Sequence, residues 1–177
     1  GSTFRCVNTQ TTLSEDFVDP LPSGCTVIEA WRGRIYAVQP MRGEGQTVVW
    51  FTQPLTYHLF NLNANFIVVP GEVRALVPTE DALLLCTDSK IFSYSGDAIK
   101  EIAPYGTPYG QTWVVDQDRV LFWTSRGLCV AAPFTNLTER QVSVPPGVFA
   151  AGALIHRGGQ KRYLVSMLQG GSAFNTF

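Results

Sequence analysis

Charged residues are scarce in this chain of 177 residues. They make up 15% of it, and 13 Lys and Arg stand against 14 Asp and Glu, for a formal net charge of -1. A chain without excess positive charge has no electrostatic basis for binding nucleic acid or an anionic membrane. The sequence also has no apolar run near the ~18 residues of a membrane span. We therefore expect no membrane partner and no direct sequence-specific nucleic acid binding.

Residues suited to metal binding are also few. The two histidines, His58 and His156, have no third ligand spaced near them, and no pair of cysteines has C-x-x-C spacing. We expect no metal site, no cofactor and four free thiols, although Cys6 and Cys25 could pair in an oxidising compartment. The four cysteines are Cys6, Cys25, Cys86 and Cys129.

Catalytic motifs are missing as well. There is no Gly-x-Ser-x-Gly elbow, and residues 116–118 (DQD) lack the Gly and terminal Glu of a calcium loop, so they predict a polar hairpin turn. Glu29, Asp88 and Glu139 could face one pocket as in propeller glycosidases, but their spacing gives no support and favours ion-pair or turn roles. We expect no enzyme activity.

No stretch keeps a helical period, whereas 16 Gly, 11 Pro and many β-branched and aromatic residues favour an all-β fold. The clearest unit is residues 112–146. Apolar strands at 112–115, 120–123 and 128–132 are separated by polar turns, and an alternating strand follows at 140–144. Four such strands of falling burial describe one blade of a β-propeller.

The same pattern, a strand, a polar turn and an apolar triplet, recurs along the chain. The triplets begin at residues 35, 83, 120 and 163, at steps of 48, 37 and 43 residues, near the periods of propeller blades. We predict a β-propeller-like domain of about four small antiparallel blades; the alternative is an antiparallel β-sandwich. Residues 1–24 are predicted to be an N-terminal arm or a ring-closing strand (at 3–7), and residues 25–177 the propeller-like domain.

Strands are predicted at several further positions. The longest connection between two predicted strands is residues 52–65, in the first unit. In the first unit we expect 27–31, 35–38, 48–51 and 66–69; in the second 73–77, 83–86, 91–94 and 98–102; in the fourth 150–154 and 161–168.

The order of the motifs resembles that of β-propeller structural proteins of tailed bacteriophage virions, of the packaged-DNA stabilisation or tail protein type. The resemblance implies a structural virion protein, present in several copies near the tail or head–tail connector and assembled in the bacterial cytoplasm. Members of that family are generally longer, so we expect the chain to be part of a larger protein. The motifs are IEAW (28–31), RIYA (34–37), VWFTQPL (49–55), NFI (65–67), VRAL (73–76), LLLCT (83–87), Gly96, SRGLC (125–129) and NLTE (136–139).

Aromatic residues in the predicted loops are the best candidates for a binding surface, because they supply contact area where burial does not explain them. In a structural protein they would anchor neighbouring subunits; the alternative is a receptor- or carbohydrate-binding propeller, in which they would stack on sugars. The loop at 104–111, with two tyrosines, is predicted either as a contact surface or as a tight crossing between blades. The candidates are Tyr57, Phe60, Tyr105, Tyr109 and Phe134.

Overall fold

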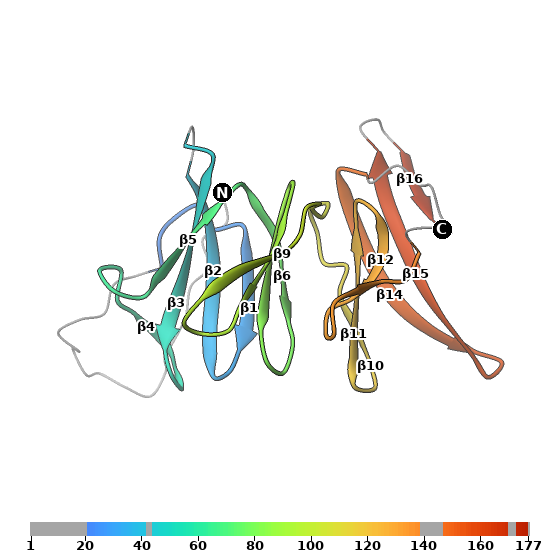
Figure 1. Cartoon of the computed structure of the whole chain (residues 1–177), viewed down its shortest axis with the longest axis horizontal. Coiled ribbons are helices and arrows are strands. Elements are labelled where there is room, and N and C mark those ends of the chain that lie inside the picture. The colour runs from blue at the N-terminus through green and yellow to red at the C-terminus, as the bar shows by residue number, and fades with distance from the viewer. Residues whose placement is uncertain (1–20, 42–43, 139–146, 170–172, 177) are drawn as a thin grey trace. The chain divides into compact units, whose positions relative to one another are not determined.

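The computed structural model describes residues 21–41, 44–138, 147–169 and 173–176. These residues form sixteen strands and no helix, and paired strands run antiparallel, which confirms the all-β prediction (Figure 1). The chain divides into two compact units, Gly1–Val73 and Arg74–Phe177. The predicted strand at 3–7, and all of the predicted arm except residues 21–24, lie outside the described residues.

The first unit is a single five-stranded sheet. Three strands follow one another as a meander, and the third strand pairs with both remaining ones. One face is apolar and buried, with Val38, Val49 and Ile67 in a single register row across three strands. The strands are β1 (Val27–Trp31), β2 (Arg34–Met41), β3 (Gln46–Gln53), β4 (Thr56–Phe60) and β5 (Phe66–Pro70).

The four predicted strands of this unit are confirmed as β1, β2, β3 and β5, but the prediction of one long loop at 52–65 is wrong. That stretch contains β4, which pairs with the end of β3 across a register shift. Leu55, with φ of 60°, makes the turn into β4, and its backbone N–H donates to the carbonyl of Gly33 at 2.7 Å. The polar character of the stretch therefore reflects a short edge strand.

The second unit holds three small antiparallel sheets in chain order, as the repeated pattern predicts. Its first sheet confirms all four strands predicted for 73–102. The predicted strand at 140–144 lies outside the described residues, and the fourth strand of the middle sheet is instead β13. The sheets are β6 (Val73–Pro78), β7 (Leu83–Thr87), β8 (Ile91–Tyr94) and β9 (Ile99–Ala103); β10 (Val114–Asp116), β11 (Arg119–Thr124), β12 (Gly127–Val130) and β13 (Thr135–Asn136); and β14 (Phe149–Arg157), β15 (Gln160–Gln169) and β16 (Ala173–Thr176).

These three sheets pack face to face, and the middle sheet contributes to both interfaces. Phe122 and Cys129, which pair across β11 and β12, point into a core shared with Val77, Leu84 and other residues of the first sheet. The next register pair, Trp123 and Leu128, points the other way and packs with residues of the last sheet, Ala150, Val165 and Met167 among them. Because both faces of β11 and β12 are covered, these strands are continuous apolar runs.

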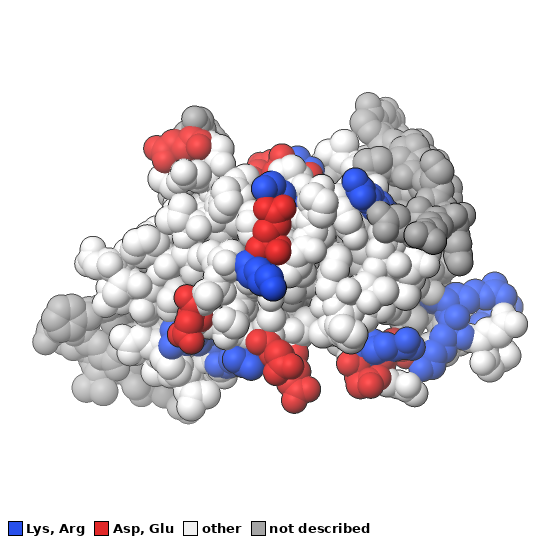
Figure 2. All heavy atoms as spheres, in the orientation of Figure 1, with Lys and Arg blue, Asp and Glu red and all other residues white. Residues whose placement is uncertain are grey.

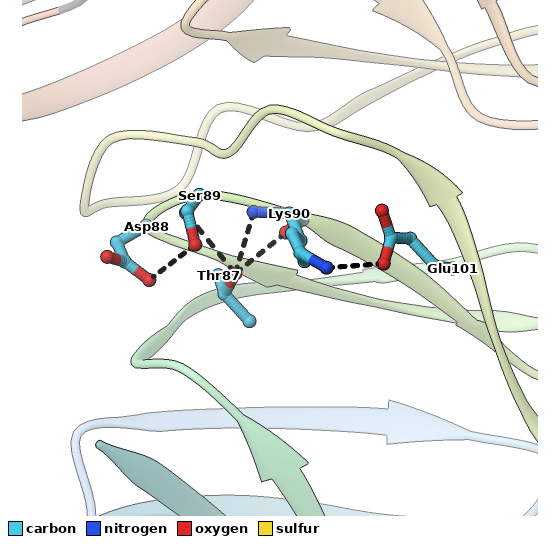
Figure 3. Close-up of polar contacts among 5 residues, drawn as sticks. All are labelled: Thr87, Asp88, Ser89, Lys90 and Glu101. Carbon is cyan, nitrogen blue, oxygen red and sulfur yellow. Dashed lines mark hydrogen bonds and ion pairs between the residues drawn. The ribbon is translucent and has the colours of Figure 1, made fainter.

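Buried threonines close equivalent turns in the first two sheets of this unit. The Thr87 hydroxyl donates to the Lys90 carbonyl at 2.9 Å and accepts from the Lys90 and Ser89 backbone N–H groups (Figure 3). Thr124 likewise donates to the Gly127 carbonyl at 2.9 Å and accepts from the Arg126 N–H at 3.2 Å. Both threonines end the strand before a two-residue turn, so the similarity between the two sheets extends to individual hydrogen bonds.

Candidate interaction surface at the paired-tyrosine loop

The loop at residues 104–111 crosses from β9 to β10 and is fixed by backbone hydrogen bonds to three places in the second unit. The Thr107 N–H donates to the Thr87 carbonyl, and the Gly106 carbonyl accepts from Ser125. Further along, Tyr109 forms a parallel bridge with Phe149 of β14. At Gly106 an added Cβ would lie 2.2 Å from the Thr87 carbonyl oxygen, so this approach requires glycine. The loop has the close packing that we expected of a tight crossing.

Tyr105 faces inward from this loop. Its ring packs on the core shared by the first two sheets, 6.3 Å from the ring of Phe134, and its hydroxyl lies 3.9 Å from the Cys129 sulfur. The Arg126 guanidinium lies over the ring, 4.9 Å from its centroid. Phe134 also contacts Phe122. Tyr105 and Phe134 are therefore half-buried packing residues, covered by an arginine.

Tyr109, the second tyrosine, is half-buried like Tyr105, but it lies beside exposed apolar residues. Its ring stacks on Phe149 with centroids 5.3 Å apart and planes at 28°, and the Arg74 guanidinium lies 4.7 Å from its centroid. Phe149 is 48% exposed and its neighbour Val148 is 44% exposed. We call Arg74, Tyr109 and Phe149 the Tyr109 stack. It brings a cation and two aromatic rings, from β6, the loop and β14, to one place on the second unit.

The remaining two candidates lie on β4 in the first unit, not in a loop. Tyr57 is 49% exposed, whereas Phe60 is 5% exposed, so the expectation that burial does not explain Phe60 is wrong. Phe60 is buried because β4 pairs with β3, which places Phe60 opposite the buried Thr52. Only Tyr57 of this pair offers ring surface to a partner.

The predicted polar turn at Asp116 is confirmed as the two-residue hairpin between β10 and β11, with Gln117 at φ of 58°. The Asp116 carboxylate, 8% exposed, accepts a hydrogen bond from the Lys161 ammonium at 2.6 Å and lies 3.7 Å from the Arg119 guanidinium. The Lys161 hydrogen bond, with the charges of Lys161, Arg119 and His156, holds the pKa of Asp116 below its ordinary value, against the opposing effect of burial. This ion pair ties β15 to β10.

Two cysteine thiols, those of Cys86 and Cys25, are buried. Burial, with a smaller effect of Cys129, raises the pKa of the Cys86 thiol, which keeps it protonated and poorly nucleophilic. Cys25, also a free thiol, donates to the Pro22 carbonyl at 3.3 Å. Within the described ranges no three His, Cys, Asp or Glu side chains gather as a metal site requires. Cys6 and Glu139 lie outside those ranges, and the side chain of His58 is not described.

Two of the three acidic candidates, Glu29 and Asp88, make local hydrogen bonds. The Glu29 carboxylate accepts from the Ala30 backbone N–H at 2.9 Å, and Asp88 is exposed at the β7–β8 turn, where it accepts from the Ser89 hydroxyl (Figure 3). The predicted turn role therefore holds for Asp88, whereas Glu29 lies on β1.

Arg74, Phe149 and Val148 are the surface residues that sequence reasoning missed. A signal was present, since apolar residues and one glycine fill successive positions from Val148 through β14 to Ile155, without the alternation of a strand with one wet face. Uncharged side chains also cover most of the surface in view in Figure 2.

No protein-family model, no curated protein and no solved structure matches the chain. The described residues form no helix of the length and apolarity that crossing a membrane requires.

Proposed function

We propose that the chain is a non-enzymatic structural component of a tailed-bacteriophage virion, in the tail or head–tail connector region, and that it acts through protein–protein contacts. The order of its motifs, which resembles that of propeller proteins from such virions, supports the virion assignment. The three successive antiparallel sheets of the second unit, stacked face to face, support a propeller-like arrangement.

The observation that carries the contact role is the Tyr109 stack. Tyrosine, phenylalanine and arginine are enriched where protein interfaces concentrate their binding energy, because they combine large apolar area with few rotatable bonds or several donors. Here the Arg74 guanidinium lies over the Tyr109 ring and the Phe149 ring stacks on it. A surface fixed in this way loses little conformational entropy when a partner covers it.

The neighbours of the stack favour protein over sugar as the partner. Val148 and Phe149 add exposed apolar surface beside the ring. A sugar site would instead need Asn or Asp side chains next to the aromatic ring to bind the hydroxyl groups. The virion role implies assembly in the bacterial cytoplasm, with other virion proteins as neighbours and several copies of this chain.

The test is size-exclusion chromatography with light scattering on the purified chain, mixed with tail proteins released from tailed-phage virions. We expect co-elution with a tail or connector protein, and we expect the double variant Tyr109→Ala/Phe149→Ala to weaken that binding by roughly tenfold or more. Tyr57→Ala, which removes an exposed ring from β4, is the matched control and should bind as the wild type does. A chain that ignores virion proteins but binds bacterial polysaccharide would replace this function by the receptor-binding alternative.

A further inference from the structure

The end of the β14–β15 hairpin carries cations and no acid. The Lys, Arg, Asp and Glu residues of β14 and β15 are Arg157, Lys161 and Arg162 alone, and no Asp or Glu follows Glu139 in the sequence. Every residue from 155 to 162 is exposed. Figure 2 shows blue side chains gathered at the end of this hairpin, at the lower right. The net charge of -1 for the whole chain therefore conceals a local excess of positive charge.

The strand register assigns these cations to two faces of the hairpin. Ile155 pairs with Arg162, and Arg157 pairs with Gln160. Opposite residues of an antiparallel pair share a face, as do residues two positions apart on one strand, so these four side chains lie on one face. Lys161, one position away from its neighbours on β15, lies on the other face. We call Ile155, Arg157, Gln160 and Arg162 the arginine face.

Lys161 and the two arginines differ in what they contact. The Lys161 ammonium donates to the Asp116 carboxylate at 2.6 Å, which ties the hairpin to β10. Among the described residues, by contrast, no carboxylate forms an ion pair with Arg157 or Arg162, and the Arg162 guanidinium donates to the amide oxygen of Gln160 at 2.8 Å. Like charges that share one face of a hairpin repel each other. An anion bound between the two arginines would remove that repulsion.

We propose that the arginine face binds an acidic segment of another protein, in which two carboxylates meet Arg157 and Arg162 and an apolar side chain packs on Ile155. A guanidinium can bind a carboxylate through two parallel hydrogen bonds, and it keeps its charge at any physiological pH. Ile155 is 40% exposed and lies opposite Arg162, so it supplies apolar contact beside the charge. The complementary partner is therefore a segment that combines carboxylates with apolar residues.

The arginine face is a separate surface from the Tyr109 stack. Phe149 of the stack and Arg157 of the arginine face are the two ends of β14. At ~3.4 Å per residue of strand, these two ends lie roughly 27 Å apart. The proposal therefore adds a second contact, with a partner of defined charge, to the contact role proposed for the stack.

The acids beside the hairpin favour a short acidic segment over nucleic acid as the partner. Asp116 and Asp118 lie at the turn between β10 and β11; Lys161 and Arg119 already face Asp116, and Asp118 is exposed. Nucleic acid carries an unbroken row of phosphates and is bound through several cations at once. These carboxylates would repel such a row, whereas two carboxylates of a protein segment need only the two cations of the arginine face.

The experiment measures the fluorescence anisotropy of labelled peptides mixed with the purified chain. The main probe is a blocked peptide that alternates Glu and Leu, and peptides of the same length with Gln or Lys in place of Glu test the need for negative charge. Arg157→Glu and Arg162→Glu each reverse one charge of the arginine face. Lys100→Glu, at an exposed cation of β9, is the matched control. All three positions are exposed, so circular dichroism should show folded proteins.

At low ionic strength we expect the wild type and the control to bind the Glu peptide, and each arginine variant to bind it roughly fivefold or more weakly. Added salt should weaken the binding, because it screens exposed charges. The decisive sample is the double variant Arg157→Glu/Arg162→Glu. It should lose the Glu peptide and bind the Lys peptide instead, since the charges of both partners are then reversed.

The proposal is overturned by a wild type that does not prefer the Glu peptide to the Gln peptide, by arginine variants that bind as the control does, or by a double variant that gains no affinity for the Lys peptide. A DNA duplex and vesicles of phosphatidylglycerol are two further probes. Tighter binding of either one than of the Glu peptide, lost in the arginine variants, would assign the face to that partner and overturn the proposal as well.

The experiment contains no virion protein, so its result is independent of the virion assignment. A chain that binds the Glu peptide but no virion protein would sustain this contact and refute the proposed function. A chain that binds a tail protein through the Tyr109 stack but shows no preference for the Glu peptide would do the opposite.

Discussion

Gly106 shows how one residue sets the path of the paired-tyrosine loop. A methyl group there would lie 2.2 Å from the Thr87 carbonyl oxygen and from the Asp88 carbonyl carbon, which are backbone atoms and cannot rotate away. We therefore predict that Gly106→Ala lowers the free energy of unfolding by about 1–3 kcal/mol, as overpacking does. Urea denaturation measures it, with Gln111→Ala, at an exposed position of the same loop, as the control. Equal stability of the two variants would contradict the close approach.

Asp116 gives a prediction in pH at the same scale. Its pKa is lowered in the folded protein, so the stability it contributes is fully present above its unfolded pKa of about 3.9 and is lost as pH falls through the folded value. We expect Asp116→Asn to lower the melting temperature at pH 6, and the difference from the wild type to shrink as pH falls below about 4. Asp118→Asn, at the exposed neighbour, is the control; a difference that stays constant with pH would refute the ion-pair origin.

At the scale of elements, the threonines that end β7 and β11 are predicted to stabilise the fold to a similar degree. Thr87 and Thr124 are fully buried, and each hydroxyl holds backbone groups of the following turn. Valine keeps the shape of threonine but leaves these groups without the hydroxyl. We predict that Thr87→Val and Thr124→Val each lower the free energy of unfolding by about 1–3 kcal/mol. Thr135→Val, at an exposed strand residue, is the control and should change the free energy of unfolding by less than about 0.5 kcal/mol. Similar losses in all three variants would show that the hydrogen bonds of the buried hydroxyls do not stabilise the fold.

The strands that sequence reasoning found are those with strong local signals. Leu83–Thr87 and Leu121–Thr124 are largely apolar runs next to turn residues, and every residue in both runs is buried. Residues 56–60 alternate weakly and follow a Pro-Leu turn, so their sequence predicts a loop where the structure has β4. β4 forms because it pairs with β3, and the sequence of residues 56–60 gives no sign of that pairing.

The candidate surface was harder to predict than the strands, for a related reason. Tyr105, Tyr109 and Phe134 are candidates because they lie outside the predicted strands, but the exposure of each ring depends on which distant segment covers it. Tyr105 is covered by Arg126 and packs on a core built from two sheets, whereas Tyr109 meets Phe149, forty residues later in the chain. The sequence around an aromatic residue therefore does not show which distant segment will contact it.

At the scale of the whole molecule, the two units each have a core of their own. Val49 is fully buried in the sheet of the first unit, and Phe122 is fully buried between two sheets of the second. A chain with two such cores departs from a single all-or-none transition. We therefore predict two transitions when urea unfolding is followed by circular dichroism and by tryptophan fluorescence.

Each transition should respond to a substitution in one core alone. Phe122→Ala is expected to cost about 3–5 kcal/mol and Val49→Ala on the order of 2 kcal/mol, because each removes buried methyl or ring carbons and leaves a cavity. We predict that each variant moves the midpoint of one transition and leaves the other in place, since sites without shared contacts act independently. If either substitution moved both midpoints together, the units would unfold as one cooperative body, and the stability of the sheets in one unit would depend on those in the other.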